Sequence, residues 1–316
     1  MAGNSSLARP EKASSLKQML ELTELSEIGR DHFTNARALW HPPGGRGIFG
    51  GAAVALCLTA AHRTVLTEFS IHSLHCYFLS VGDSKIPITF TVQRVRDGKS
   101  FATRTVLASQ RGKCILTTTM SFMRPASGEV PGMQHSSTMP DWITPPAEDD
   151  PNYASASLYA PQVFPVGIQG EEGPPQDQTV RIWIRAPGQI SQARDYAAHQ
   201  IILAYMSDWN FLPCAPIVQK RWKFPEAVSI NATRSPLVGT AIGMISTLDH
   251  TIYFHEPTKI RADNWTLFEV DSPWTGHDRA IVRGKMFAKD GTLLATCCQE
   301  GVIRLRKDIK VEGPRI

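Results

Sequence analysis

Residues 52–65 read AAVALCLTAAHRTV, a run that is apolar on nearly every side when it is wound as a helix. A helix of this kind is buried on most of its faces. The run follows HPPGGRGIFGG at 41–51, a Pro/Gly-rich turn that marks the point where the helix starts. We therefore expect a central buried helix that begins close to Gly50 and Gly51.

Working outward, four segments after this helix have the composition of strands, and the turns GDSK, RDGK and QRGK separate them. Short turns of this kind are typical of antiparallel hairpins. The strands are expected at 71–80, 86–95, 101–109 and 114–123. Before the central helix, the spacing of leucine and methionine predicts a short helix over 15–29, and 33–40 is a candidate strand.

The same order of elements recurs in the second half of the chain. Residues 192–207 predict a helix, and strands are expected at 161–169, 179–186, 242–254, 264–271, 279–288 and 292–305. An internal alignment places SLHCYFLS beside LDHTIYFH, and places FATRTVLASQRGKCILTTTMSFM beside RAIVRGKMFAKDGTLLATCCQEGVI, with Gly112 opposite Gly291. The pattern alone thus predicts two similar α+β halves, each with one buried helix and an antiparallel meander.

A change in composition separates the halves. Ten of the 22 prolines lie between Pro125 and Gln178, together with an acidic run at 148–150. This composition predicts an inter-domain linker. We expect an N-terminal domain at 1–124, a Pro-rich linker at 125–158 and a C-terminal domain at 159–316.

Length and charge narrow the class of protein. The 316 residues are 42% hydrophobic and 20% charged, which is ordinary for a soluble globular protein. A formal charge of +4 is too small to argue for nucleic acid as a partner. The longest apolar stretch, 49–61, is shorter than the ~20 residues that a bilayer needs, so no membrane span is expected. Six cysteines without a CxxC pair favour reduced thiols in an intracellular compartment.

Several motifs point away from common site chemistries. Residues 45–50 match GxGxxG formally, but no βαβ unit surrounds them, so a dinucleotide site is disfavoured. What remains is glycine at a helix start, where a ligand can approach the helix N–H groups, or else a plain tight turn. No GxSxG elbow occurs. The histidines at 72, 75, 250 and 255 have no carboxylate or cysteine at metal-ligand spacing, so they are interpreted as packing or hydrogen-bonding residues, and no metal is expected.

Three polar residues of the second half are the candidate catalytic set. Asp208 follows a buried helix, Thr247 lies within an apolar strand, and Gln299 occupies the position that the internal alignment gives to Met120 in the first half. Each has an ordinary alternative: an exposed helix-end acid, a plain strand former and a solvent-facing strand residue. Together they are what water-mediated hydrolysis requires, namely a carboxylate that accepts a proton and a hydroxyl and an amide that hold the water.

With these residues in view, the chain resembles the acyl-CoA thioesterase II family, the double hot-dog enzymes of bacteria and peroxisomes. The stretches that carry the resemblance run from about residue 15 to 306: FGGAAVALCLTAA, HSLHCYFLSVGDSKIPI, VQRVRDGKSFATRTV, RIWIRA, YMSDWNFLP, ISTLDHTIYFH and ATCCQEGVIR. The resemblance implies two antiparallel sheets, each wrapped round a central helix. It also implies hydrolysis of acyl-CoA to a free acid and CoA without a cofactor.

The family pattern also implies roles for individual residues. Its aspartate corresponds to Asp208, its threonine to Thr247 and its glutamine to Gln299, and these would activate one water with no acyl-enzyme. We add the hypothesis that N–H groups near Gly50 and Gly51 bind the substrate by polarising the thioester carbonyl.

Other functions and properties stay open at this point. The same scaffold can serve an enoyl-CoA hydratase, although no paired Asp and His occur at 45–55, or a non-catalytic acyl-CoA binding protein. The partner expected is acyl-CoA, and the chain is a possible homo-oligomer. The C-terminal Pro314–Arg315–Ile316 is a weak relative of the SKL type of peroxisomal signal, so a peroxisomal or a cytoplasmic location is expected.

Overall fold

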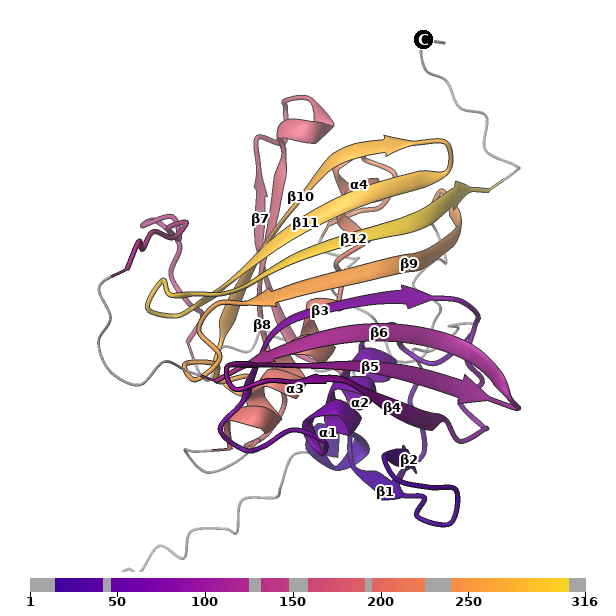
Figure 1. Cartoon of the computed structure of the whole chain (residues 1–316). Coiled ribbons are helices and arrows are strands. Elements are labelled where there is room, and N and C mark those ends of the chain that lie inside the picture. Colours follow the sequence, from indigo (N-terminus) through magenta and orange to yellow (C-terminus); the bar gives the residue numbers. More distant parts are fainter. Residues whose placement is uncertain are drawn as a thin grey trace, which may run out of the picture.

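One continuous antiparallel sheet of 12 strands forms the body of the protein, and the two long helices lie on one of its faces (Figure 1). The computed structural model describes residues 15–41, 47–124, 132–147, 159–190, 195–224 and 240–306. The strand order is β1-β2-β4-β5-β6-β3-β9-β12-β11-β10-β8-β7. The sheet therefore contains both halves of the chain, which meet where β3 pairs with β9.

The elements of the two halves follow the same plan. The first half contains α1 (Ser15–Met19), β1 (Leu22–Glu24), β2 (His32–Asn35), α2 (Gly50–His62), β3 (Ser70–Phe78), β4 (Thr89–Asp97), β5 (Phe101–Gln110) and β6 (Lys113–Met123). The second contains β7 (Gln162–Gln169), η1 (Pro175–Asp177), β8 (Thr179–Arg185), α3 (Tyr196–Ser207), α4 (Cys214–Val218), β9 (Ile242–Phe254), β10 (Thr266–Gly276), β11 (Arg279–Ala288) and β12 (Leu293–Leu305).

This plan relates the halves by a pseudo-twofold axis. Towards the centre of the sheet, the first half reads β2-β4-β5-β6-β3 and the second reads β8-β10-β11-β12-β9. In the chain, α2 precedes β3 as α3 precedes β9. Each half is thus a curved antiparallel sheet around one helix, and the predicted double hot-dog is confirmed. The two sheets expected from the sequence are joined edge to edge into one.

Matching irregularities support the internal alignment at the level of single residues. Ile115 in β6 and Leu294 in β12 are each the unpaired residue of a register shift in their hairpins. Met120 and Gln299 each lie five residues further along, and Gly112 and Gly291 both have positive φ in the preceding turns. The alignment of Met120 with Gln299 therefore agrees with the strand registers.

Small residues in α2 allow the two helices to approach each other closely. Ten of its 13 residues are buried, and five of these ten are alanine, which favours a helix and fills little space. An added Cβ on Gly51 would collide with the backbone oxygen of Tyr205, near the end of α3. The start of α2 therefore lies against the end of α3, which makes the two helices antiparallel.

Several predicted boundaries were wrong, each for a local reason. The helix expected at 15–29 stops at Met19, because the chain continues into β1, which pairs with β2. The strand expected at 264–271 extends to Gly276, with Pro273 in a bulge where no ladder N–H is needed. The short α4 was not predicted. In the linker, residues 125–131 and 148–158 lie outside the described part of the chain, as does the C-terminal tripeptide 314–316.

Met120 provides a test of the asymmetry between the halves. Its side chain is fully buried between β5 and β3, whereas the pseudo-equivalent Gln299 is a candidate catalytic residue. We expect Met120→Ala to lower the free energy of unfolding by about 2–5 kcal/mol, as large-to-small core changes do, with turnover retained. Chemical denaturation and a rate assay on the folded variant measure both quantities. Loss of turnover in a fully folded Met120→Ala protein would contradict the assignment of the catalytic residues to the second half of the chain.

Candidate active site

Asp208 lies where the end of α3 meets the start of α2. It is the residue that caps the C-terminus of α3, and it is partly buried. The Gly51 N–H donates a hydrogen bond to its carboxylate. An added Cβ on Gly50 would lie 2.7 Å from Asp208 Oδ2. The carboxylate therefore rests on the first turn of α2, where the helix dipole favours a negative charge.

Gln299 reaches Asp208 from the opposite side. Its Nε2 donates to Asp208 Oδ1 at 2.6 Å, although the two residues are 91 positions apart in sequence. Its side chain is fully buried in β12, so the expectation of a solvent-facing alternative does not apply. Its Oε1 is buried and has no hydrogen-bond partner among the described residues. This oxygen can therefore accept a hydrogen bond from a molecule that binds beside the carboxylate.

Thr247 reaches the same face of the sheet through a bulge in β9. Gln299 pairs with His250, and Gly301 pairs with Thr247, so that Leu248 is left unpaired between them. Residues paired across a ladder share a face, and so do residues two apart along a strand. Without the bulge, Thr247 and His250 would point to opposite faces, because they are three residues apart.

The shared face is the one that carries Asp208. An added Cβ on Gly301 would collide with Leu212, four residues after Asp208. Thr247, opposite Gly301, thus faces the loop that begins with the candidate base. Among the described residues its hydroxyl makes no hydrogen bond with a side chain. The structure joins Asp208 and Gln299 directly and places Thr247 on their side of the sheet.

The environment of Asp208 raises the pKa of its carboxyl from 3.8 to about 6. Burial is the main cause, because it disfavours the charged form. The hydrogen bonds from Gln299 and from the Gly51 N–H act in the opposite direction and keep the value from rising further. A carboxyl with a pKa near 6 is ionised at neutral pH and is a stronger base than an ordinary aspartate.

Aromatic side chains from both halves pack on one another next to Asp208 in sequence and next to the start of α2. Trp209 follows Asp208 and stacks on Trp40 with a centroid distance of 5.8 Å. Phe49, directly before α2, packs edge-on against Trp209 at 5.3 Å and against Tyr205 at 4.9 Å. These residues were not predicted from the sequence. The signal available was position alone, since Trp209 and Phe49 adjoin Asp208 and Gly50.

A buried hydrogen bond between Ser207 and His250 anchors the end of α3 to the sheet. The Ser207 hydroxyl donates to the Ala204 carbonyl at 2.9 Å, so the His250 Nε2–H donates to Ser207 Oγ, also at 2.9 Å. Burial lowers the pKa of His250 to about 3, so the ring is neutral. This bond fixes the residue before Asp208, and the interpretation of His250 as a hydrogen-bonding histidine is confirmed.

The other histidines also have structural partners. His72 and His255 bond to Ser121 and Thr296 at 2.8 Å, and His75 bonds to Thr251 at 3.2 Å. Within the described ranges, no group of three His, Cys, Asp or Glu residues is arranged to hold a metal ion.

Comparisons with known proteins give this arrangement a family context. The family model described as the acyl-CoA thioesterase N-terminal domain matches residues 37–123, and that of the acyl-CoA thioesterase C-terminal domain matches residues 134–303. The acyl-coenzyme A thioesterase 8 of Mus musculus is 34% identical, and the alignment covers 86% of this chain and 85% of that protein. The peroxisomal acyl-coenzyme A thioester hydrolase 1 of Saccharomyces cerevisiae is 26% identical, with 92% and 94% covered.

Solved structures are similar over nearly the whole chain. An acyl-CoA thioesterase II from Mycobacterium marinum superposes with a TM-score of 0.70 at 28% identity, covering 94% of this chain and 99% of that one. A protein with a hot-dog fold from Alicyclobacillus acidocaldarius superposes with a TM-score of 0.68 at 21% identity, covering 93% and 100%. The second likeness supports the fold alone.

Proposed function

The chain belongs to the acyl-CoA thioesterase II family, and on this premise we propose that Asp208, Thr247 and Gln299 hydrolyse the thioester through one activated water. The activity itself is acyl-CoA hydrolysis to a free acid and CoA. The observation that carries the residue assignment is the 2.6 Å hydrogen bond from Gln299 to Asp208 beside an unpartnered Gln299 Oε1.

The water is held by groups with complementary hydrogen-bonding roles. Gln299 Oε1 accepts one water hydrogen, and Asp208 accepts the other and removes it as the water oxygen attacks the thioester carbonyl carbon. The Thr247 hydroxyl contacts the same water from the neighbouring strand. Gln299 Nε2 meanwhile holds Asp208 in place, so that the base is oriented before the substrate arrives.

The first turn of α2 stabilises the carbonyl oxygen of the thioester. Since the Gly51 N–H is donated to Asp208, we assign the Gly50 N–H to the oxyanion that forms on attack. Collapse of the tetrahedral intermediate breaks the C–S bond, and protonated Asp208 returns its proton to the departing thiolate. The atoms balance with water as the only co-reactant, and no acyl-enzyme forms.

A thiol-trapping assay with a series of saturated acyl-CoAs tests this function. We expect stoichiometric release of CoA and free acid without added metal or nucleotide. Hydration of an enoyl-CoA without thiol release would favour the hydratase alternative. Tight binding of acyl-CoA without release of either product would favour a non-catalytic binding protein.

The raised pKa of Asp208 predicts the pH dependence of the assay. Only the ionised carboxylate accepts a proton, so kcat/KM is expected to rise about tenfold per pH unit below pH ~6 and to level off above it. The profile is measured at constant ionic strength between pH 4.5 and 8. In Asp208→Asn the residual rate should lack this limb. An unchanged limb in that variant would assign the ionisation to another group.

The domain organisation and the location of the protein are also part of the proposal. We keep the division into domains at 1–124 and 159–316, joined by the linker at 125–158. A peroxisomal location is supported by the name of the yeast relative, with the cytoplasm as the alternative. No helix among the described residues is long and apolar enough to cross a membrane.

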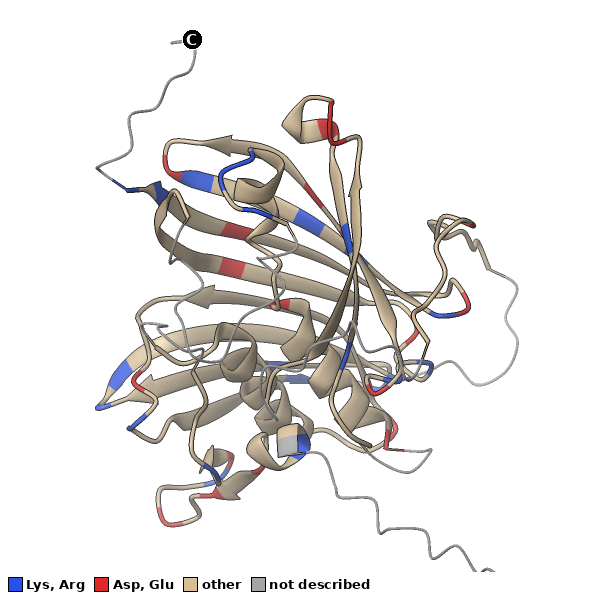
Figure 2. Ribbon diagram, turned by 180° about the vertical axis from the view of Figure 1, so that it is seen from behind, with Lys and Arg blue, Asp and Glu red and all other residues tan. Residues whose placement is uncertain are grey.

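We also propose that two copies of the chain associate through the outer face of the central strands. β3 carries no charged residue, and Figure 2 shows charges on β9, β11 and β12 instead. Tyr77 is 61% exposed and shares its face with Leu107, since both align with Thr117 of β6. Exposed aromatic residues are typical of interface cores, and Asp249 of β9, which pairs with Tyr77, places a charge at the border of this apolar face, as in the polar rim of an interface.

Light scattering on the purified protein tests the association. We expect a dimer mass, and we expect Tyr77→Lys to shift the protein to monomer with its thermal stability unchanged. The control Ile28→Lys, also an exposed apolar residue but in the turn between β1 and β2 at the far edge of the sheet from β3, should remain a dimer. A monomer for the unaltered chain at all concentrations would contradict the proposal.

A further inference from the structure

The pseudo-twofold axis that relates the halves also relates the two ends of the helix pair. One end holds the start of α2 and the end of α3, where Asp208 lies. The other end holds the start of α3 and the end of α2. Asp208 and Arg63 are the residues that cap the C-termini of α3 and α2, so Arg63 occupies the pseudo-equivalent position of the candidate base.

A cavity of about 480 Å³ lies at this second end. Its size is within the range of small-molecule sites, ~300–1,000 Å³. Its apolar wall comes from the residue that follows α1, from the segment between α2 and β3 and from α3, and includes Leu20, Val65, Phe69, Ile201 and Ile202. The cavity therefore has room and apolar surface for an aliphatic chain.

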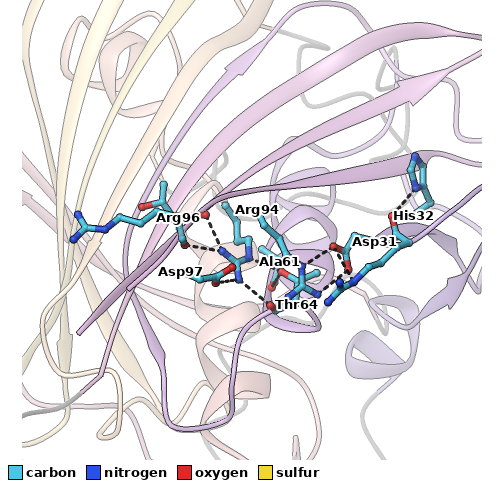
Figure 3. Close-up of polar contacts among 10 residues, drawn as sticks. Asp31, His32, Ala61, Thr64, Arg94, Arg96 and Asp97 are labelled. Carbon is cyan, nitrogen blue, oxygen red and sulfur yellow. Dashed lines mark hydrogen bonds and ion pairs between the residues drawn. The ribbon is translucent and has the colours of Figure 1, made fainter. Parts of the chain in front are cut away.

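The chemistry at this end differs from that of the active site. Met120 replaces Gln299, and a cation, Arg63, replaces the carboxylate. The neighbouring Thr64 is held by the buried guanidinium of Arg104, which donates to the Thr64 carbonyl at 2.9 Å and also pairs with Asp97 (Figure 3, where Thr64 and Asp97 are labelled). The end of α2 is thus rigidly fixed and carries no equivalent of the water-activating set.

The charges around the cavity leave one cation without a carboxylate. Of the two acids in the lining, Asp195 pairs with Lys17 at 2.8 Å and Glu21 pairs with Arg37 at 3.5 Å. Arg63 lies over the Phe33 ring and, among the described residues, forms no ion pair. The start of α3 in the same lining is already capped by Asp195, whose carboxylate accepts from the Ala198 N–H, so Arg63 is the group that is left to attract an anion.

Two buried polar atoms of the lining also need partners. Gln200 is 1% exposed, and its Nε2 donates to the Pro257 carbonyl at 3.1 Å, but its Oε1 has no partner among the described residues. His62 Nε2 is also buried without a hydrogen bond of good geometry, although Gln200 lies close enough to act on the His62 pKa against the effect of burial. Burial lowers the pKa of His62 to about 4, so the ring is neutral. Unpaired buried polar groups destabilise a protein, and a ligand that pairs with them gains affinity.

We propose that this cavity is a second, non-hydrolysing site that binds an aliphatic carboxylic acid, the class of product that the active site releases. Its carboxyl group lies against Arg63, His62 and Gln200, and its chain lies along the apolar wall. A carboxylate brings two acceptor oxygens, which bind the Arg63 guanidinium and an N–H of the neutral His62 ring, while Gln200 contacts His62 and positions it. No covalent step is involved.

Photo-crosslinking with a diazirine-bearing decanoic acid, followed by peptide mass spectrometry, tests the site. We expect cross-links to peptides that contain residues 59–70 and 195–202, in addition to any that form near Asp208 where product leaves. Decanoic acid should compete for the first set at least tenfold better than decanol, which has the same chain without the carboxyl group. Cross-links confined to the vicinity of Asp208 and Gln299, or equal competition by decanol, would overturn the proposal.

Two variants and a control make the assignment specific. Arg63→Met and Gln200→Leu are each expected to weaken cross-linking of the second site about tenfold, because the first removes the cation that binds the carboxylate and the second removes the side chain that positions His62. Arg304→Met removes an exposed arginine on β12 and should change nothing. All three should release thiol from acyl-CoA at the rate of the unaltered chain, which shows that they are folded. Undiminished cross-linking in both variants would refute the binding mode. Because binding is read without turnover, failure here is distinct from failure of the hydrolytic assignment.

Discussion

Asp208→Asn is expected to lower kcat by 10²–10⁴-fold and to leave the protein at least as stable as before. Asparagine keeps the size of the side chain and can still bond to Gln299, but it cannot accept the proton of the attacking water. A positioned general base contributes a factor in this range. KM should change little, since the carboxylate acts on the water and not on CoA.

The pH dependence of the stability of Asp208→Asn is a second, independent test of the raised pKa of Asp208. The folded-state pKa of Asp208, about 6, is above its unfolded value of 3.8, so ionisation in the fold weakens stability as the pH rises between these values. Asparagine carries no such penalty. Above pH ~6 the variant should therefore be more stable, by up to about 3 kcal/mol, and the advantage should vanish near pH 4.

The control for this variant is Asp278→Asn, an exposed aspartate in the turn before β11, which should affect neither rate nor stability. Thr247→Val and Gln299→Ala should each lower kcat less than Asp208→Asn does. When either substitution is combined with Asp208→Asn, kcat should fall little further, because all three residues act on one water. Fully additive losses would mean that the three act in separate steps.

Gly50→Ala is expected to have the next largest effect, a loss of about 10²-fold in kcat. The new methyl carbon would lie 2.7 Å from Asp208 Oδ2 and 3.2 Å from the Phe78 ring, so the carboxylate must move. Displacement of a catalytic group by about 1 Å can cost a factor of this size. Alanine favours a helix more than glycine does, so a destabilised α2 should not be the cause of the lower kcat.

Gly243→Ala is the matched control, since an added Cβ there meets its neighbours at an ordinary 3.4 Å. It lies on β9 with Thr247, and it should retain full activity. Steady-state rates and melting temperatures of both glycine variants separate the two effects. Wild-type turnover in Gly50→Ala would show that the close contact between Gly50 and Asp208 has no catalytic role.

Much of the fold follows from local patterns. The run at 52–65 predicted α2 because alanine and leucine without a polar stripe suit only a buried helix. The glycine turns predicted the hairpins, and the repeated order predicted the two halves. The helix ending at Ser207 and the strands at 242–254 and 279–288 have the expected C-terminal ends.

The failures arise where long-range pairing overrides local preference. Leucine spacing predicted a helix through residue 29, yet Leu22 pairs with Asn35 in β1 and β2. Thr247 could be placed on a strand, but its face depends on a bulge that only the pairing with β12 reveals. The contact of Asp208 with Gly51 joins residues more than 150 positions apart, and no spacing rule predicts it.

The measurement that tests the role of Asp208 most directly is a single turnover in H₂¹⁸O with enzyme in excess of acyl-CoA. Direct attack by water predicts that every molecule of acid from the first turnover carries one ¹⁸O, that the peptide containing Asp208 keeps its mass, and that rapid quenching traps no adduct. A carboxylate nucleophile would instead form an anhydride with Asp208. Unlabelled acid in the first turnover with ¹⁸O appearing in Asp208, or an acyl–Asp208 adduct in the quenched protein, would contradict the general-base mechanism.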